Sequence, residues 1–154
     1  MALVKSILKN ELQAFCNENA VNFSGYPGSF EEAAGKWSKA FDSYARGVTP
    51  ISTTSVGAKS AFEVQFLASK GKEDISFLKS CFAKYVQVLA TGMAPLFIAT
   101  PPNQGALNLE IISTLGLNGG SSEACLDSLC TLIDTWMRTG IAVNSISGIT
   151  TTWI

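Results

Sequence analysis

The sequence predicts a mainly α-helical single domain, a bundle of about five helices with a short β-like arm at its C-terminal end. Apolar residues recur at helical spacing in separate segments that are bounded by Ser, Gly or Pro. A chain of 154 residues with 47% hydrophobic content can build one core without metal or disulfide support. We therefore expect a helical domain over residues 1–140 and an arm or hairpin over residues 141–154.

The first two predicted helices differ in how clearly they begin. The first covers about Leu3 to Cys16, where the apolar side chains fall on one broad side. The second begins with a capping box, in which Ser29 is the N-cap and Glu32 reaches back toward it. Its apolar residues occupy a narrow arc and Gly47 is a natural C-cap, so this segment predicts a strongly amphipathic helix.

The third and fourth helices are expected between Pro50 and Gly92. The third runs to about Ser69, and its apolar residues spread around most of the helical wheel. We therefore place it centrally or at an intermolecular contact. The fourth begins at Glu73-Asp74, because acidic residues suit the positive end of a helix dipole, and it ends near Gly92.

A long stretch between Lys84 and Glu110 carries no charged residue. Its most apolar part is shorter than the roughly 20 residues that a membrane-spanning helix needs, and Gly and Pro interrupt it. We therefore expect a buried helix followed by a buried loop, and no membrane partner. The connection from Leu96 to Gly120 is long and contains a predicted short helix near Leu107 to Leu115.

The fifth helix begins at a Ser121 or Ser122 cap and runs to Thr139, where Gly140 closes it. Residues 141–154 then change in character, because charges are absent and β-branched residues dominate. The turn formers Asn144-Ser145 and Ser147-Gly148 allow a small hairpin here.

The tail either folds back or reaches another molecule. Fully extended it would span roughly 46 Å, against a radius of gyration of about 15 Å for a domain of this size. Trp153 can dock onto the domain's own core or, by strand addition, onto a neighbouring subunit. On the second alternative the interface residues are expected to be Ile146, Ile149, Trp153 and Ile154.

The residue types exclude several kinds of chemistry. The formal net charge of −1 argues against specific nucleic-acid binding through phosphate neutralisation. The absence of histidine excludes His-based triads and His metal sites. Neither a P-loop nor a G-x-S-x-G motif occurs. We expect no catalytic residue, no metal and no cofactor, and hence a protein that is not an enzyme.

The four cysteines form no C-x-x-C pair, so a zinc ribbon or a thioredoxin-type motif is not supported. We expect them to be small buried hydrophobic residues, with disulfide formation left open as the alternative. These residues are Cys16, Cys81, Cys125 and Cys130.

Several segments together resemble small virion structural proteins of tailed bacteriophages. These are residues 36–45 (KWSKAFDSYA), 92–97 (GMAPLF) and 133–142 (IDTWMRTGIA), with Pro50, Thr53-Thr54, residues 58–62 and Thr100-Pro101-Pro102 between them. The resemblance implies a helical body and a mobile or β-like terminal arm that contacts neighbours in the tail, neck or baseplate. It implies a symmetric oligomer whose partners are copies of itself and other virion proteins. It places the protein in the virion, made in the host cytoplasm, and it supplies no catalytic residues.

Two other functions remain open on the sequence. A helical-bundle module could bind an apolar small ligand or a partner protein, with a cavity lined by Phe62, Phe66, Phe82 and Phe97. An enzyme that uses a carboxylate or a cysteine would need a thiol whose pKa is strongly lowered.

Overall fold

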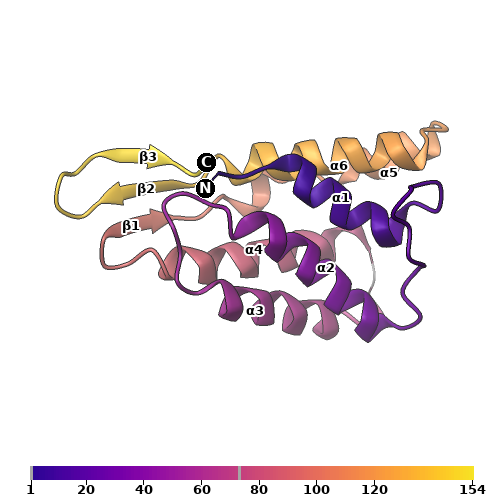
Figure 1. Cartoon of the computed structure of the whole chain (residues 1–154), viewed down its shortest axis with the longest axis horizontal. Coiled ribbons are helices and arrows are strands. Elements are labelled where there is room, and N and C mark those ends of the chain that lie inside the picture. Colours follow the sequence, from indigo (N-terminus) through magenta and orange to yellow (C-terminus); the bar gives the residue numbers. More distant parts are fainter. Residues whose placement is uncertain (1, 73) are drawn as a thin grey trace.

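The computed structural model describes residues 2–72 and 74–154, and it confirms a mainly helical domain with a β-structured tail (Figure 1). Within these residues there are six α-helices and three strands, together with one short 3₁₀ turn, η1. In chain order the elements are α1 (Lys5–Cys16), α2 (Phe30–Ala45), α3 (Ser55–Ala68), α4 (Ile75–Thr91), β1 (Phe97–Thr100), η1 (Gln104–Ala106), α5 (Glu110–Leu117), α6 (Ser122–Met137), β2 (Ile141–Asn144) and β3 (Thr150–Thr152).

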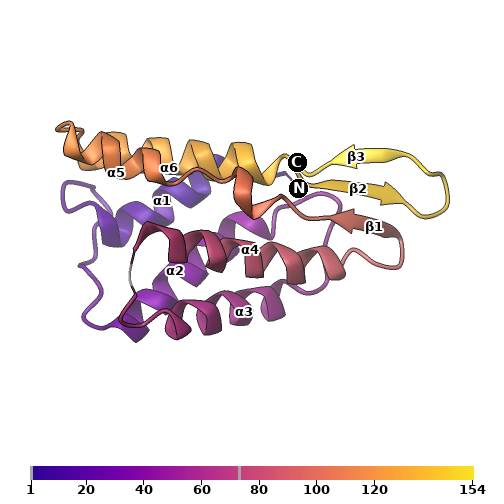
Figure 2. The same cartoon turned by 180° about the vertical axis from the view of Figure 1, so that it is seen from behind.

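The helices pack around α2 and α4. Both views show α1 and α6 along one side and α3 along the other, while the strands extend beyond the helices at one end (Figures 1 and 2). Aromatic rings fill the centre of the bundle. The centroid of the Phe41 ring lies 4.7 Å from the ring centroid of Phe82 and 4.8 Å from that of Tyr85. These apolar contacts are the main stabilising term of the fold.

The helix starts follow local hydrogen bonding. Ser29 Oγ accepts a hydrogen bond from the backbone N–H of Glu32 at 3.0 Å, which confirms Ser29 as the N-cap of α2. The Glu32 carboxylate reaches back as predicted, but it accepts the N–H of Gly28, at 2.8 Å, one residue before the N-cap. Ser121 caps α6 by accepting the N–H of Ala124. Asp74 caps α4 as expected, whereas Glu73 lies outside the described residues.

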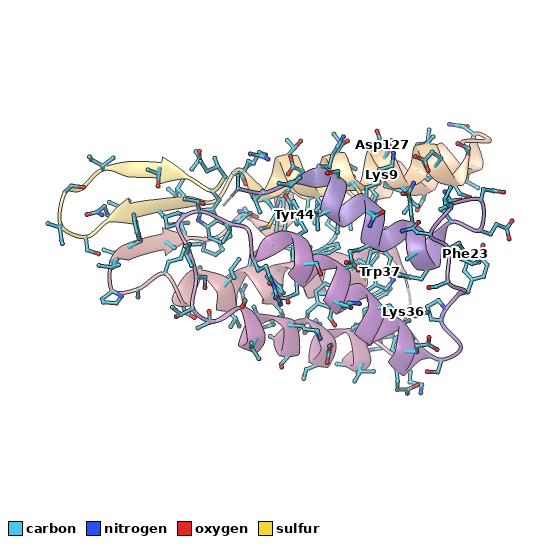
Figure 3. All side chains as sticks on the ribbon, in the orientation of Figure 1. Lys9, Phe23, Lys36, Trp37, Tyr44 and Asp127 are labelled. Carbon is cyan, nitrogen blue, oxygen red and sulfur yellow. The ribbon has the colours of Figure 1, made fainter. Side chains whose placement is uncertain are left out.

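Ion pairs join the first and the last long helix. Lys9 on α1 and Asp127 on α6 lie side by side, with 3.2 Å between Nζ and Oδ1 (Figure 3). Lys9 Nζ also lies 2.6 Å from a carboxylate oxygen of Glu123. Hydrogen bonding from Lys9 lowers the pKa of both carboxyl groups below their ordinary values.

Of the two positions expected for the third helix, the central one is wrong, and the position at an intermolecular contact stays a prediction. Helix α3 buries Ala58, Phe62 and Phe66 toward the core and lies on the outside of the bundle. Its opposite face leaves Val56 and Val64 exposed, Val64 with 68% of its surface accessible. The spread of apolar residues around this helix reflects an exposed apolar strip, because only one face has helices to pack against.

The tail forms a hairpin, and a third strand joins it. Strands β2 and β3 are antiparallel and β1, from the long connection after α4, pairs antiparallel with β2, giving the order β1-β2-β3. Gly148, in the predicted turn, has a φ of +68°, which an L side chain rarely adopts. The arm is therefore a small sheet that is shared with residues from the middle of the chain.

Candidate interaction surface

The register separates the two faces of the sheet. Ala142 is fully buried and pairs with Ala99 and Thr151, so these residues share the face that is directed toward the helices. The alternate residues share the outer face, and there Ile98 keeps 69% of its surface exposed. The outer-face residues are Ile98, Thr100, Ile141, Val143, Thr150 and Thr152.

The sheet carries no charged side chain. Residues 85–109 and 139–154, which supply all three strands, contain no Asp, Glu, Lys or Arg. Isolated apolar residues on a surface are ordinary, but an apolar sheet face without any charge is typical of a surface that another molecule covers.

The tip of the hairpin is ordered by hydrogen bonds. The Asn144 side-chain oxygen accepts the N–H groups of Ile146 and Ser147, each at 2.9 Å. Ser145 ties the tip to the start of β1 through its N–H, which donates to the carbonyl of Leu96 at 2.9 Å. This rigid turn presents two of the predicted interface residues, Ile146 with 89% and Ile149 with 62% of the residue surface exposed.

Of the two alternatives for Trp153, the structure has the one in which the side chain docks onto the domain's own core, so its place among the interface residues is corrected. The residue is fully buried, and its backbone N–H donates to the carbonyl of Gly140 at 2.8 Å. The indole packs so closely on Gly140 that a Cβ there would lie 2.5 Å from a ring carbon. The indole Nε1 has no hydrogen-bond partner among the described residues.

Ile154, the fourth predicted interface residue, fixes the end of the tail to the α2–α3 connection. Its N–H donates to the carbonyl of Thr49 at 3.3 Å, and the N–H of Thr49 donates back to the Ile154 carbonyl at 2.8 Å. Reciprocal bonds between two residues are the hydrogen-bonded pair of an antiparallel ladder. The side chain of Ile154 remains partly exposed beside a groove.

An apolar groove of about 630 Å³ lies beside β3. Its walls come from the connection at residues 49–53, from residues 92–97, and from the last residues of the chain. Pro50, Ile51, Met93, Pro95, Leu96 and Phe97 supply most of its apolar lining. No charged side chain lines this groove.

The aromatic cavity predicted between the helices is not present, because the rings fill it. The ring centroids of Phe62 and Phe82 lie 5.5 Å apart, and Phe66 packs edge-on against Phe77 at 4.9 Å. Only Phe97, of the four predicted lining residues, borders the groove. An apolar ligand would therefore find its space in the groove at the root of the sheet and not among these rings.

A second hollow, of about 700 Å³, lies at the opposite end of the molecule and is lined mainly by polar residues. The amides of Gln13 and Asn17 line it, and both donate to the same carboxylate oxygen of Glu123, at 2.7 and 3.1 Å. Because these groups satisfy one another, this hollow is a weaker candidate for a binding site than the apolar groove.

Burial disfavours the ionised form of three cysteines. It raises the pKa of the Cys16 thiol to about 11, and those of Cys81 and Cys130 to about 12. A nucleophilic thiol needs the opposite shift. All four cysteines are free, and no group of three or more potential metal ligands from His, Cys, Asp and Glu forms within the described part of the chain.

Two carboxylates, the buried Asp42 and the partly buried Asp134, hold tyrosines rather than a reactive centre. Asp42 accepts the hydroxyl of Tyr85 and Asp134 accepts that of Tyr44, each at 2.7 Å. Each aspartate also pairs with the arginine four residues later, which is the C-cap of its helix. Desolvation, assisted by the neighbouring carboxylate, raises the pKa of both phenols far above the ordinary value.

A scan of protein-family models, a search of curated proteins and a search of solved structures each find no match to this chain. Among the described residues, no helix combines the length and the apolar character that crossing a membrane requires.

Sequence reasoning missed the contribution of β1. Its outer-face residue Ile98 and the neighbouring groove residues lie in a segment that was expected to be a buried loop. One local signal was present: residues 96–99 form a short apolar run between Pro95 and Pro101, which is typical of a strand.

Proposed function

We propose that this protein is a non-enzymatic structural subunit of a bacteriophage virion, in the tail, neck or baseplate, and that it acts through interfaces formed by its sheet. The observation that carries the proposal is the charge-free outer face of a sheet that extends beyond the helices. The resemblance of residues 36–45, 92–97 and 133–142 to such proteins supports the same function.

Burial of this face needs no chemistry to be useful. Removing apolar surface from water contributes roughly 25 cal/mol for each Å², and backbone groups at a sheet edge add directional hydrogen bonds. The hairpin is ordered before it meets a partner, so little conformational entropy is lost on assembly. A repeated subunit in a symmetric particle multiplies these contributions.

Incorporation into particles tests the proposal. The variant Ile98→Lys places a charge on the outer face, and Val64→Lys is its matched control on α3, because the two residues are 69% and 68% exposed. Mass spectrometry of purified particles, made with each variant as the only copy, is expected to find Val64→Lys and not Ile98→Lys. Particles that contain no copy of the chain, or that accept Ile98→Lys as readily as Val64→Lys, would contradict the proposal.

A second candidate function is a module that binds an apolar small ligand, and the groove of about 630 Å³ favours it. This function predicts that the melting temperature rises with the concentration of an apolar fluorescent probe. Leu96→Asp, a substitution of an exposed groove residue, is expected to abolish that rise while the unfolding transition of the probe-free protein is retained. A rise that survives Leu96→Asp would place the probe elsewhere.

A further inference from the structure

The two edges of the sheet differ in whether they can accept another strand. On β1 the outward-directed N–H of Phe97 already donates to the carbonyl of Met93 at 3.1 Å, and Pro101-Pro102 follow the strand directly. Both features block strand addition. Strand β3 has neither feature within its three residues, which are all exposed and uncharged threonines. Its outward edge is already paired only beyond the strand, where Ile154 bonds to Thr49.

The hydrogen bonds of the hairpin show which backbone groups of β3 remain open. The Trp153 N–H donates to the carbonyl of Gly140, and the Asn144 N–H donates to the carbonyl of Ile149. The backbone N–H and C=O groups of residues 149, 151 and 153 are therefore directed toward β2. The backbone groups of Thr150 and Thr152 therefore point away from β2. Those of Ile154, two residues further on, point the same way and pair with Thr49. No described residue pairs with the outward N–H and C=O groups of Thr150 and Thr152.

We propose that the β3 edges of two copies of this chain pair antiparallel about a two-fold axis at Thr151. In this register Thr150 of each copy lies opposite Thr152 of the other, and all four outward N–H and C=O groups of each strand find a partner. No other antiparallel register of β3 with itself satisfies all of these groups, because outward residues must face outward residues. The proposal deepens the proposed function and rests on it, since it names the partner of the same sheet.

Charge and side-chain direction favour a second copy as the occupant. A two-fold axis brings each side chain near its own counterpart, so a charged edge would repel itself, and residues 139–154 contain no charge. The same register places Ile149 of the second copy opposite Trp153, at the end of β3 that borders the apolar groove. The Trp153 indole is fully buried in its own core, so the apolar neighbours of the exposed Ile149 side chain are the lining residues of that groove. The two outer faces join into one continuous sheet.

A charge swap tests both the pairing and its register. The double variant Thr150→Lys/Thr152→Lys places lysine opposite lysine twice across the axis, whereas Thr150→Lys/Thr152→Glu places lysine opposite glutamate. Sedimentation equilibrium is expected to show a dimer for the unaltered chain and for the Lys/Glu variant. The dissociation constant of the Lys/Lys variant should be about tenfold higher or more.

Controls keep this test independent of folding. Thr100→Lys, at another exposed threonine of the outer face, on β1, is expected to leave the dimer intact. At concentrations at which every chain is monomeric, each variant should retain the unfolding midpoint of the unaltered chain. Equal loss of the dimer in the Lys/Lys and Lys/Glu variants, equal retention in both, or a chain that is monomeric at every concentration would overturn the proposal.

The outcome also separates this inference from the proposed function. If Ile98→Lys is excluded from particles while the Lys/Lys variant enters them normally, the proposed function stands and the edge pairing falls. If the chain alone is monomeric and the Lys/Lys variant is excluded from particles, self-pairing is overturned in favour of a strand from a different virion protein.

Discussion

Gly140→Ala should destabilise the protein through one contact, the close approach of the Trp153 indole. A Cβ at position 140 would lie 2.5, 2.8 and 2.9 Å from three ring carbons of Trp153, whereas carbon atoms in contact prefer about 3.5–4.0 Å. Gly140 does not have a positive φ, so alanine fits the backbone and the whole penalty is steric. The ring must therefore move by about 1 Å, within a close-packed core.

Overpacking of this kind costs about 1–3 kcal/mol, which for a domain of this size lowers the melting temperature by about 3–10 °C. Gly35→Ala is the matched control. A Cβ at Gly35 meets no atom within 4 Å, and the position lies inside α2, where alanine favours the helix by roughly 0.5–1 kcal/mol. The same chemical change should thus lower stability at one position and raise it at the other.

Urea and thermal unfolding of both variants measure the difference, and tryptophan fluorescence reports whether the indole environment changes in Gly140→Ala. The reasoning would be refuted by a Gly140→Ala protein whose unfolding midpoint and fluorescence match those of the unaltered chain. A loss of stability as large in Gly35→Ala would also refute it, because the effect could then not be assigned to Trp153.

Three further predictions concern buried and charged groups. In a double-mutant cycle of Asp42→Ala and Tyr85→Phe, the free energies of unfolding should show a coupling of about 1–3 kcal/mol. If the losses of stability in the two single variants simply add up in the double variant, their hydrogen bond contributes nothing. Hydrogen bonding to Lys9 lowers the pKa of Glu123 in the folded state. The ionised Glu123 carboxylate therefore stabilises the fold fully above the pKa that it has in the unfolded chain. This stabilisation is lost as the pH falls through the lower pKa of the folded state. The melting temperature should therefore fall from about pH 5 to pH 3, less steeply in Glu123→Gln, and stay level from about pH 5.5 to 8 because the chain has no histidine. Alkylation of the native protein should leave Cys81 and Cys130 unmodified until the chain unfolds, because both thiols are buried and their pKa values are raised to about 12. Mass spectrometry measures the modification, and rapid labelling of either thiol would contradict the packing around it.

Local signals were sufficient to predict most of the helices and the hairpin. Ser29 and Glu32 act on residues within one helical turn, and Asn144 and Gly148 act within one hairpin turn, so their effects can be recognised in a short window of sequence. The helix ends differ from the predicted ones by a few residues, as expected because the terminal turns of helices fray and several neighbouring residues can act as the cap.

Non-local contacts explain what could not be predicted. Strand β1 forms because Ile98 pairs with Val143, 45 positions later in the chain, and nothing within residues 97–100 specifies that partner. The outward position of α3 depends on which of its apolar faces the other helices cover. Trp153 could be assigned to the core only by knowing that Gly140 leaves space for its ring. Of the candidate surface, Ile146 and Ile149 were predicted as interface residues of the tail, whereas the groove and the face around Ile98 required the fold.

Both ends of the described chain lie against the short stretch that follows α2. The backbone of Ala2 approaches Gly47, and Ile154 pairs with Thr49, so the first and last described residues lie close together at the root of the hairpin (Figures 1 and 2). A short linker between residues 2 and 154 would make the backbone a closed ring without moving a helix. New ends could then be opened at Gly119-Gly120, at the far end of α6 from the sheet. Such a circular permutant would carry tags and fusion proteins away from the hairpin and leave the arm unobstructed for assembly.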